Sequence, residues 1–266
     1  MMYHEDIYTK FMIEYDKANV LSSYPSLTEY EVATFLDKAY NALIAQKVTG
    51  NNVRVMGLET DVKVVEDLSP LIVTTSLTLN NVQQSQDNAL YSKNIMYVNV
   101  PKNSYLYFIS AALKKSVSGT PMDEHVVRAL PIKLVSHQMA NKFLNKAYNL
   151  PWIKQPVGYI EQNKLYIIYD PSDSSFDNVD PQQDRLSITY IKKPNTFVKN
   201  LDDTSKFPTT SGVYTMFHSP NDNDYYKFEC NDSMVEELIS LAIVYALENI
   251  ESDRLSTKLN MRGLES

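Results

Sequence analysis

Residues 231–251 read NDSMVEELISLAIVYALENIE, and this stretch is the clearest structural signal in the chain. Three residue types that cap helix N-termini open it, and Ser233 with Glu236 has the spacing of a capping box. Apolar residues then recur at helical spacing and spread beyond one face. A helix this apolar must be covered from more than one side. We therefore predict a helix over residues 233–251 that lies within a core.

The partners of this helix are expected near the N-terminus. Residues 5–17 carry apolar side chains at i, i+4 spacing, which predicts a short amphipathic helix. A second helix is predicted to begin at a capping box of Thr28 and Glu31, although the same pattern two residues earlier is an alternative frame. It should end near Gly50, the residue type that favours the left-handed turn after a helix.

A third and weaker helix is predicted over residues 58–68, with Val62, Val65 and Leu68 on one side. The pattern changes after Pro70. Segments rich in Val, Ile, Tyr and Thr then predict strands at residues 72–79, 95–100, 104–113, 126–135, 186–190 and 225–230. A hairpin is predicted from residues 159–160 and 165–169, and a short helix near residues 136–148.

Together these elements predict an α+β fold in which an inserted mixed β region interrupts a helical bundle. The bundle is expected to contain residues 1–80 and 231–252, so that the N-terminal helices meet the C-terminal helix. Residues 81–230 would form the β-rich insertion, and residues 253–266 a polar tail.

Composition excludes several classes of protein. The net charge of −7 argues against a protein that grips nucleic acid along its phosphates. A single cysteine, Cys230, excludes a disulfide framework and any cysteine-based zinc site. Neither a signal peptide nor a membrane-spanning run is expected, because the longest strongly apolar run, residues 238–247, is too short. We expect a protein made in a reducing cytosol that has no contact with membranes.

No catalytic constellation emerges from the chain. The sequence has neither a nucleophile elbow nor a glycine-rich phosphate loop, and Cys230 is expected to be a small buried hydrophobe. The four histidines have no metal-ligand spacing and are expected at the surface or at helix caps: His4, His125, His137 and His218. We therefore predict no catalytic residue, no cofactor and no metal.

Two features leave alternatives open. Five aspartates between residues 170 and 184 supply oxygens that calcium prefers, but they lack the spacing of a calcium-binding loop, so a solvated loop is the alternative. Trp152 is either an anchor for a contact with another protein or a core residue.

Three stretches in order carry a resemblance to a known family. The first combines FMIEYDK (residues 11–17) with YEVATFLDKA (residues 30–39), and the second is PIKLVSH (residues 131–137) followed by Pro151 and Trp152. The third joins ITYIKKP (residues 188–194) to the C-terminal helix with ALENIES (residues 246–252). In this order the chain resembles the structural ring proteins that connect portal to tail in crAss-like tailed bacteriophages.

The resemblance implies a non-enzymatic virion protein at the head-to-tail junction or tail, assembled in the bacterial host cytoplasm. It implies a homo-oligomeric ring, with twelve-fold symmetry, that docks on the portal or a neighbouring ring while genomic DNA passes through without specific binding. Ring subunits need heterologous interfaces, which exposed strand edges can supply. The predicted assembly contacts are Tyr190, Lys192, Lys193, Pro194, Trp152, Arg254 and Leu255.

Other readings remain open at the level of sequence. Within the same class, the chain is alternatively a tail-tube or completion protein. From other classes, a carbohydrate-binding β module would use tyrosines and aspartates of the middle region, and an enzyme would use a calcium-assisted aspartate site.

Overall fold

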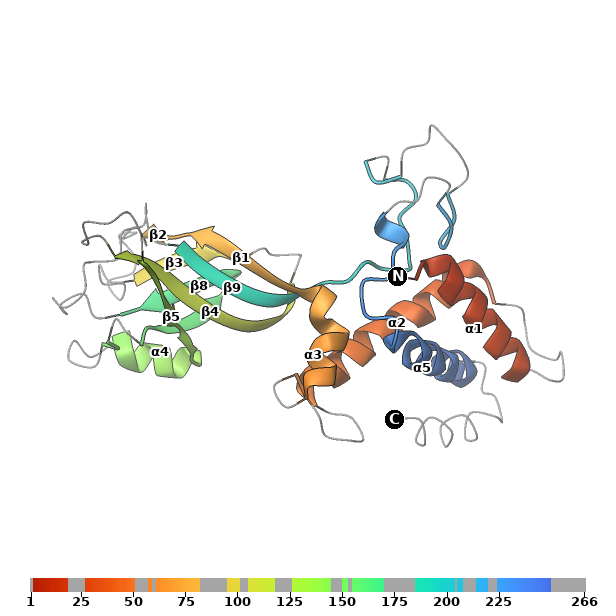
Figure 1. Ribbon diagram of the computed structural model, residues 1–266, viewed down its shortest axis with the longest axis horizontal. Helices are drawn as coiled ribbons and strands as arrows, with labels where there is room; N and C mark the ends of the chain where they lie inside the picture. The colour runs from red at the N-terminus through yellow and green to blue at the C-terminus, as the bar shows by residue number, and fades with distance from the viewer. Residues whose placement is uncertain are drawn as a thin grey trace. The chain divides into compact units, whose positions relative to one another are not determined.

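The computed structural model describes residues 2–18, 27–50, 57–58, 61–81, 95–100, 105–117, 126–144, 150–152, 155–169, 185–203, 205–207, 214–219 and 224–249. The protein is a mixed α+β chain (Figure 1) that divides into two compact units. We call Met1–Leu71 with Pro194–Ser266 the helical unit, and Ile72–Lys193 the β unit.

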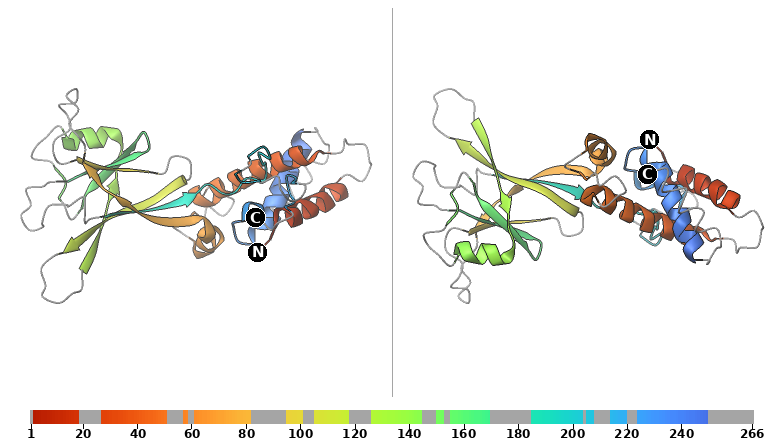
Figure 2. Two further views of the ribbon diagram at one scale, coloured as in Figure 1. Left: turned by 90° about the horizontal axis from the view of Figure 1, so that it is seen from above. Right: turned by 90° about the horizontal axis from the view of Figure 1, so that it is seen from below.

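The helical unit contains helices from both ends of the chain. They are α1 (His4–Ala18), α2 (Glu29–Thr49), α3 (Val62–Leu68) and α5 (Met234–Asn249), with the short 3-10 helices η1 (Ser69–Leu71) and η3 (Asp224–Tyr226). Helix α5 packs against α1 and α2, and both views of Figure 2 show it beside them.

Helix α5 is as apolar as its sequence predicts. Eleven of its sixteen residues are buried, including the neighbours Leu241, Ala242 and Ile243, which cannot share one face. The predicted capping box at Ser233 is wrong. The Ser233 hydroxyl instead donates to Asp67 Oδ1 at 2.6 Å, a charge-assisted hydrogen bond to a buried carboxylate.

The predicted ends of α2 are confirmed. Thr28 Oγ1 accepts from the Glu31 backbone N–H at 3.3 Å, and Glu31 Oε2 accepts from the Thr28 backbone N–H at 2.8 Å, which completes the capping box. Gly50 closes the helix at φ 70°, a left-handed conformation that costs glycine little. The first helix, α1, is also confirmed, with Ile7, Phe11 and Tyr15 buried along one face.

Helix α3 corrects the predicted apolar face. It begins at Val62. The Asp61 side chain caps its N-terminus by accepting a hydrogen bond from the Lys63 backbone N–H at 3.0 Å. Val62 and Val65 are 75% and 39% exposed, whereas Val64 and Leu68 are buried. In so short a helix either pair has helical spacing, so packing and not periodicity decides which pair turns inward.

The strand predicted at residues 225–230 is also wrong. Its first part belongs to the 3-10 helix η3, and the rest pairs with the N-terminus through an isolated bridge from Tyr3 to Lys227. The Phe228 backbone N–H donates to the Met2 carbonyl at 2.9 Å. The apolar alternation of this segment therefore reflects burial of Phe228 and Cys230 in the helical unit, not membership of a sheet.

The β unit holds two sheets and one helix. The four-stranded sheet has the order β1 (Ile72–Thr78), β9 (Arg185–Lys192), β4 (Tyr105–Val117) and β5 (Val126–Pro131). The five-stranded sheet has the order β2 (Asn80–Asn81), β3 (Ile95–Asn99), β8 (Lys164–Ile168), β7 (Val157–Glu161) and β6 (Lys133–Leu134). Helix α4 (His137–Leu144) packs against β7 and β8.

One hydrophobic core joins the two sheets. Its buried residues come from both, for example Leu113 and Ile188 from the four-stranded sheet with Val98 and Ile167 from the five-stranded sheet. A smaller cluster around Ala140 and Tyr159 fixes α4. The predicted hairpin is confirmed, and its turn places Gln162 and Asn163 at positive φ, as a tight two-residue turn requires.

The segment predicted as one strand at residues 126–135 serves both sheets. Pro131 ends β5, since proline has no backbone N–H, and the Ile132 N–H donates to the Ala111 carbonyl at 2.9 Å. Residues 133–134 then form β6, which pairs in parallel with β7.

The division of the chain falls at Leu71/Ile72 and Lys193/Pro194, whereas the sequence suggested residues 80 and 230. β1 lies in the β unit because all seven of its residues pair with β9. Residues after Pro194 belong to the helical unit, since the backbone N–H groups of Phe197 and Val198 donate to Asp37 of α2.

Candidate functional site

The residues predicted as assembly contacts lie in different surroundings. Tyr190 is 7% exposed and packs in the sheet core near Tyr105, with ring centroids 6.3 Å apart. Pro194 is buried, Lys192 is half-buried and Lys193 is exposed. Because a side chain buried in its own chain offers no surface to a neighbour, Tyr190 and Pro194 are corrected to core positions.

Trp152 lies on the surface of the β unit. Its side chain is 48% exposed, which favours the contact alternative over the core alternative. Two further large hydrophobic residues among the described part of this unit are exposed, Leu134 of β6 at 39% and Met139 of α4 at 43%. The sequence did not single these two out, because nothing in their local pattern distinguishes an exposed leucine or methionine from a buried one.

Some predicted features lie outside the described residues. These are Arg254 and Leu255, His125, and the aspartates of residues 170–184.

The four-stranded sheet of the β unit has a long strand at each edge. Among the described strands, β1 has β9 as its one neighbour and β5 has β4. These two edge strands are seven and six residues long. The edge strands of the other sheet, β2 and β6, have two residues each. Long edges present rows of backbone donors and acceptors to a pairing strand, whereas short ones do not.

The helical unit is held by a buried ion cluster. Lys47 Nζ of α2 lies 2.9 Å from Asp67 Oδ2 of α3 and 3.1 Å from Glu237 Oε2 of α5. Burial alone lowers the pKa of Lys47, but the hydrogen bonds that Lys47 donates to Asp67 and Glu237, with the charges of these carboxylates, outweigh it and raise the pKa. Lys47 and Asp67 are 8% and 2% exposed, so the pair that joins α2 to α3 lies away from solvent, while the partly exposed Glu237 extends the cluster to α5.

A second anchor holds the segment after Pro194 against α2. The Asp37 carboxylate accepts from Phe197 N–H at 2.7 Å and from Val198 N–H at 3.0 Å. Lys199 Nζ donates to the carbonyls of Thr196 and Tyr225. Burial lowers the pKa of Lys199 to about 8, with the nearby carboxylates of Asp37 and Glu229 opposing this change.

His4 corrects the expectation of surface histidines. It is fully buried, and its ring lies 4.2 Å from that of Phe197. Neither ring nitrogen has a hydrogen-bond partner within the described part of the chain. Burial, with a smaller contribution from the charge of Lys199, lowers the pKa of His4 to about 2.

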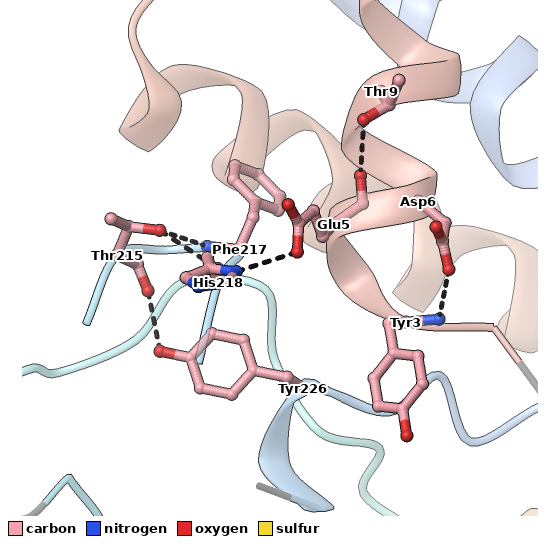
Figure 3. Close-up of polar contacts among 8 residues, drawn as sticks. All are labelled: Tyr3, Glu5, Asp6, Thr9, Thr215, Phe217, His218 and Tyr226. Carbon is pink, nitrogen blue, oxygen red and sulfur yellow. Dashed lines mark hydrogen bonds and ion pairs between the residues drawn. The ribbon is translucent and has the colours of Figure 1, made fainter. Parts of the chain in front are cut away.

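Next to this buried histidine, a surface contact ties α1 to residues 214–219 (Figure 3). His218 Nδ1 lies 2.9 Å from Glu5 Oε2, and both side chains are more than half exposed. The Thr215 hydroxyl accepts from the His218 backbone N–H at 3.0 Å, and the Thr215 carbonyl accepts from the Tyr226 hydroxyl at 2.7 Å. These contacts join residues 214–219 to α1 and to Tyr226.

Several polar groups of the described residues take part in the packing contacts above. No three His, Cys, Asp or Glu side chains among them are grouped so as to hold a metal ion. Cys230 is buried, as predicted, and accepts a hydrogen bond from the Tyr40 hydroxyl at 3.1 Å. Burial raises the pKa of the Cys230 thiol to about 12, which keeps it protonated and unreactive at neutral pH. No helix in the described part of the chain has the length and apolar character needed to cross a membrane.

The function of the chain is argued from its fold and from these surfaces, because comparison with known proteins identifies no relative. No protein-family model matches the chain, and no curated protein matches it significantly.

Proposed function

We propose that the chain is a structural subunit of a ring in the head-to-tail connector or tail of a crAss-like tailed bacteriophage. The observation that carries this proposal is a helical unit into which a β unit is inserted, with two long strands, β1 and β5, that have one neighbour each among the described strands. Helical bundles with β insertions are the arrangement that the sequence resemblance implies for connector subunits. Open edges suit a protein that works by contact with copies of itself.

In this proposal the two units have separate roles. Helices α1, α2 and α5 form the helical bundle that docks on the portal or an adjacent ring. The β unit contacts neighbouring copies around the ring, and exposed Trp152 adds an aromatic anchor of the kind enriched in interfaces. The net charge of −7 keeps DNA from adhering as it passes through the channel.

Mass spectrometry of purified virions tests the proposal. We expect the chain in virions at a fixed ratio to the portal protein, and equal copy numbers for a twelve-fold ring. A replication enzyme of the same phage, which should be absent after purification, is the control. Absence of the chain from virions carrying the full portal complement would overturn the proposal.

The same measurement separates the other structural role. A tail-tube protein would be present in several-fold excess over portal, because tubes stack many rings. A ring or completion protein would match portal or fall below it.

A further inference from the structure

We propose that β1 of one copy pairs with β5 of the next copy, so that the four-stranded sheets of neighbouring copies join into one antiparallel sheet. This inference rests on the proposed role as a self-assembling subunit and names the surfaces that it uses. The first support is topological. Three successive antiparallel pairings separate β1 from β5, so the two edge strands run in opposite directions. Copies placed side by side with the same strand direction therefore meet as an antiparallel pair.

The composition of β1 is the second support. Proteins usually protect a long edge strand with charged residues, proline or a bulge. The sequence of β1 is IVTTSLT, which has no charge and no proline, and its pairing with β9 is regular throughout. β5 carries Arg128 and Pro131. One protected edge and one unprotected edge suit pairing between the two, while β5 pairing with a second β5 is disfavoured.

Partial burial at the edge is the third support. Val73 and Leu77 of β1 pack against the core of the β unit but remain half-buried. On the opposite face, Thr74, Ser76 and Thr78 are exposed. A strand added beside β1 covers apolar surface of Val73 and Leu77 that is now exposed, and this burial favours association.

The faces of the two strands select one register. Leu130 of β5 is in the core, and its neighbours Ala129 and Pro131 are exposed. If core residues oppose core residues and all six residues of β5 are paired, Val73 must oppose Leu130 and Thr74 must oppose Ala129. Shifting by one residue places exposed residues opposite core residues, and shifting by two leaves part of β5 unpaired.

Backbone directions agree with this register. The Ala111 carbonyl of β4 accepts from Ile132 and is therefore directed toward the β5 side. Ala111 opposes Ile188 of β9, and opposed residues in an antiparallel pair either exchange both hydrogen bonds or neither. The backbone N–H and C=O of Ile188 therefore point toward β1, and those of its partner Thr75 point toward β9.

Since directions alternate along a strand, Thr74 and Ser76 direct their backbone groups away from β9, to the open side. On β5 the N–H of Ile132 points toward β4, so Ala129 points outward. Thr74 and Ala129 thus form a hydrogen-bonded pair in the proposed register, with Cα atoms about 5.5 Å apart. Pro131, opposite Ile72, lacks an N–H and removes one bond at the end of the ladder.

Cysteine crosslinking of the full-length chain tests the pairing. A disulfide spans Cα separations of roughly 4.4–6.8 Å, which includes the Thr74–Ala129 pair between copies. We expect the double variant Thr74→Cys/Ala129→Cys to give, after mild oxidation, a ladder of covalent dimers, trimers and larger species on a non-reducing gel. Cys230 stays silent, because it is buried and protonated.

The matched control is Thr78→Cys/Ala129→Cys, in which the first cysteine lies four residues along the strand, about 13 Å out of register. It should give no ladder, and neither should the single variants. Crosslinking by Thr74→Cys alone would show that two β1 edges meet, which overturns the inference. A folded double variant without a ladder, or equal ladders from both double variants, also overturns it.

The same crosslinking in virions separates this inference from the proposed function. If the chain is present in virions and the double variant gives no ladder there, the pairing is wrong and the structural role stands. If the ladder forms in solution and the chain is absent from virions, the pairing stands and the virion role is wrong.

Discussion

His4 makes the stability of the helical unit sensitive to acid. Its pKa falls from 6.5 to about 2 on folding, so the unfolded chain binds a proton between these values and the folded chain does not. The destabilisation due to His4 is therefore absent above pH 6.5 and grows as the pH drops below it. Lys199 titrates at about 8 and above, in a separate window, so the two effects can be measured independently.

We expect His4→Phe to remove this acid sensitivity. Phenylalanine suits the aromatic surroundings of Phe197 and Tyr226 and carries no proton. Between pH 7 and pH 5 the wild type should lose on the order of 2 kcal/mol of unfolding free energy that the variant keeps. Urea unfolding at several pH values measures the difference. The exposed His137→Gln is the control, and it should follow the wild type; parallel pH curves for His4→Phe would contradict the assignment.

Asp67 is the second residue with a large expected effect. Asp67→Ala leaves Lys47 with one partially exposed partner, Glu237, and removes the acceptor of the Ser233 hydroxyl. Breaking a buried ion pair on one side costs about 3–5 kcal/mol. Lys10→Ala, which removes a surface pair with Glu236, should cost less than about 1 kcal/mol. Similar losses in denaturant unfolding would show that the buried cluster does not stabilise the helical unit.

At the scale of single residues, the sequence predicted the helix caps but not which polar residues are buried. The caps at Thr28, Glu31 and Gly50 were predicted because they depend on residues a few positions apart. His4 and Asp67 were not, because their burial depends on segments from the other end of the chain. Neither residue type has a local pattern that marks it as buried.

Among the elements, α5 has the most central position, since it packs against both α1 and α2. Its long apolar stripe predicted this burial. Strands such as β4 and β9 were also predicted from composition. The sequence did not predict which face of α3 is buried, that the segment after η3 is not a strand, or that β5 and β6 are separate strands. Partners distant in sequence decide these three features.

Leu238 tests the role of α5. It is completely buried, so Leu238→Ala should cost about 2–5 kcal/mol, and Leu238→Asp should prevent folding of the helical unit or its assembly. The exposed Glu248→Ala on the same helix should change stability by less than about 0.5 kcal/mol. Thermal unfolding followed by circular dichroism compares the three variants. A stable, cooperative Leu238→Asp protein would show that α5 is dispensable for the fold.

On the scale of the whole molecule, one continuous unit is inserted into a discontinuous one. The chain enters the β unit at Ile72 and leaves it at Lys193, and these ends are neighbours because Ile72 opposes Ile191 in the β1–β9 pair. The sequence predicted the insertion but not its boundaries, since only the pairing of β1 with β9 shows where the β unit begins and ends.

We expect the β unit to fold without the helical unit. Residues 72–193 contain both sheets and their shared core, and their adjacent ends need no support to stay together. Joining Leu71 to Pro194 by a short flexible linker should likewise leave a folded helical unit. Cooperative unfolding of each fragment, followed by circular dichroism, checks this. Fragments that fold only when mixed would show that the two units depend on each other.

The discontinuity of the helical unit also has a consequence for the order of events on the ribosome. Helices α1 and α2 emerge first, yet α5 completes their core only after roughly 180 further residues, which take on the order of 10–40 s to synthesise. The inserted β unit is finished before then. Helices α1 and α2 are thus made before the β unit but mature after it, with their apolar faces uncovered while the later unit folds, and translation has to pass α5 before the helical unit exists.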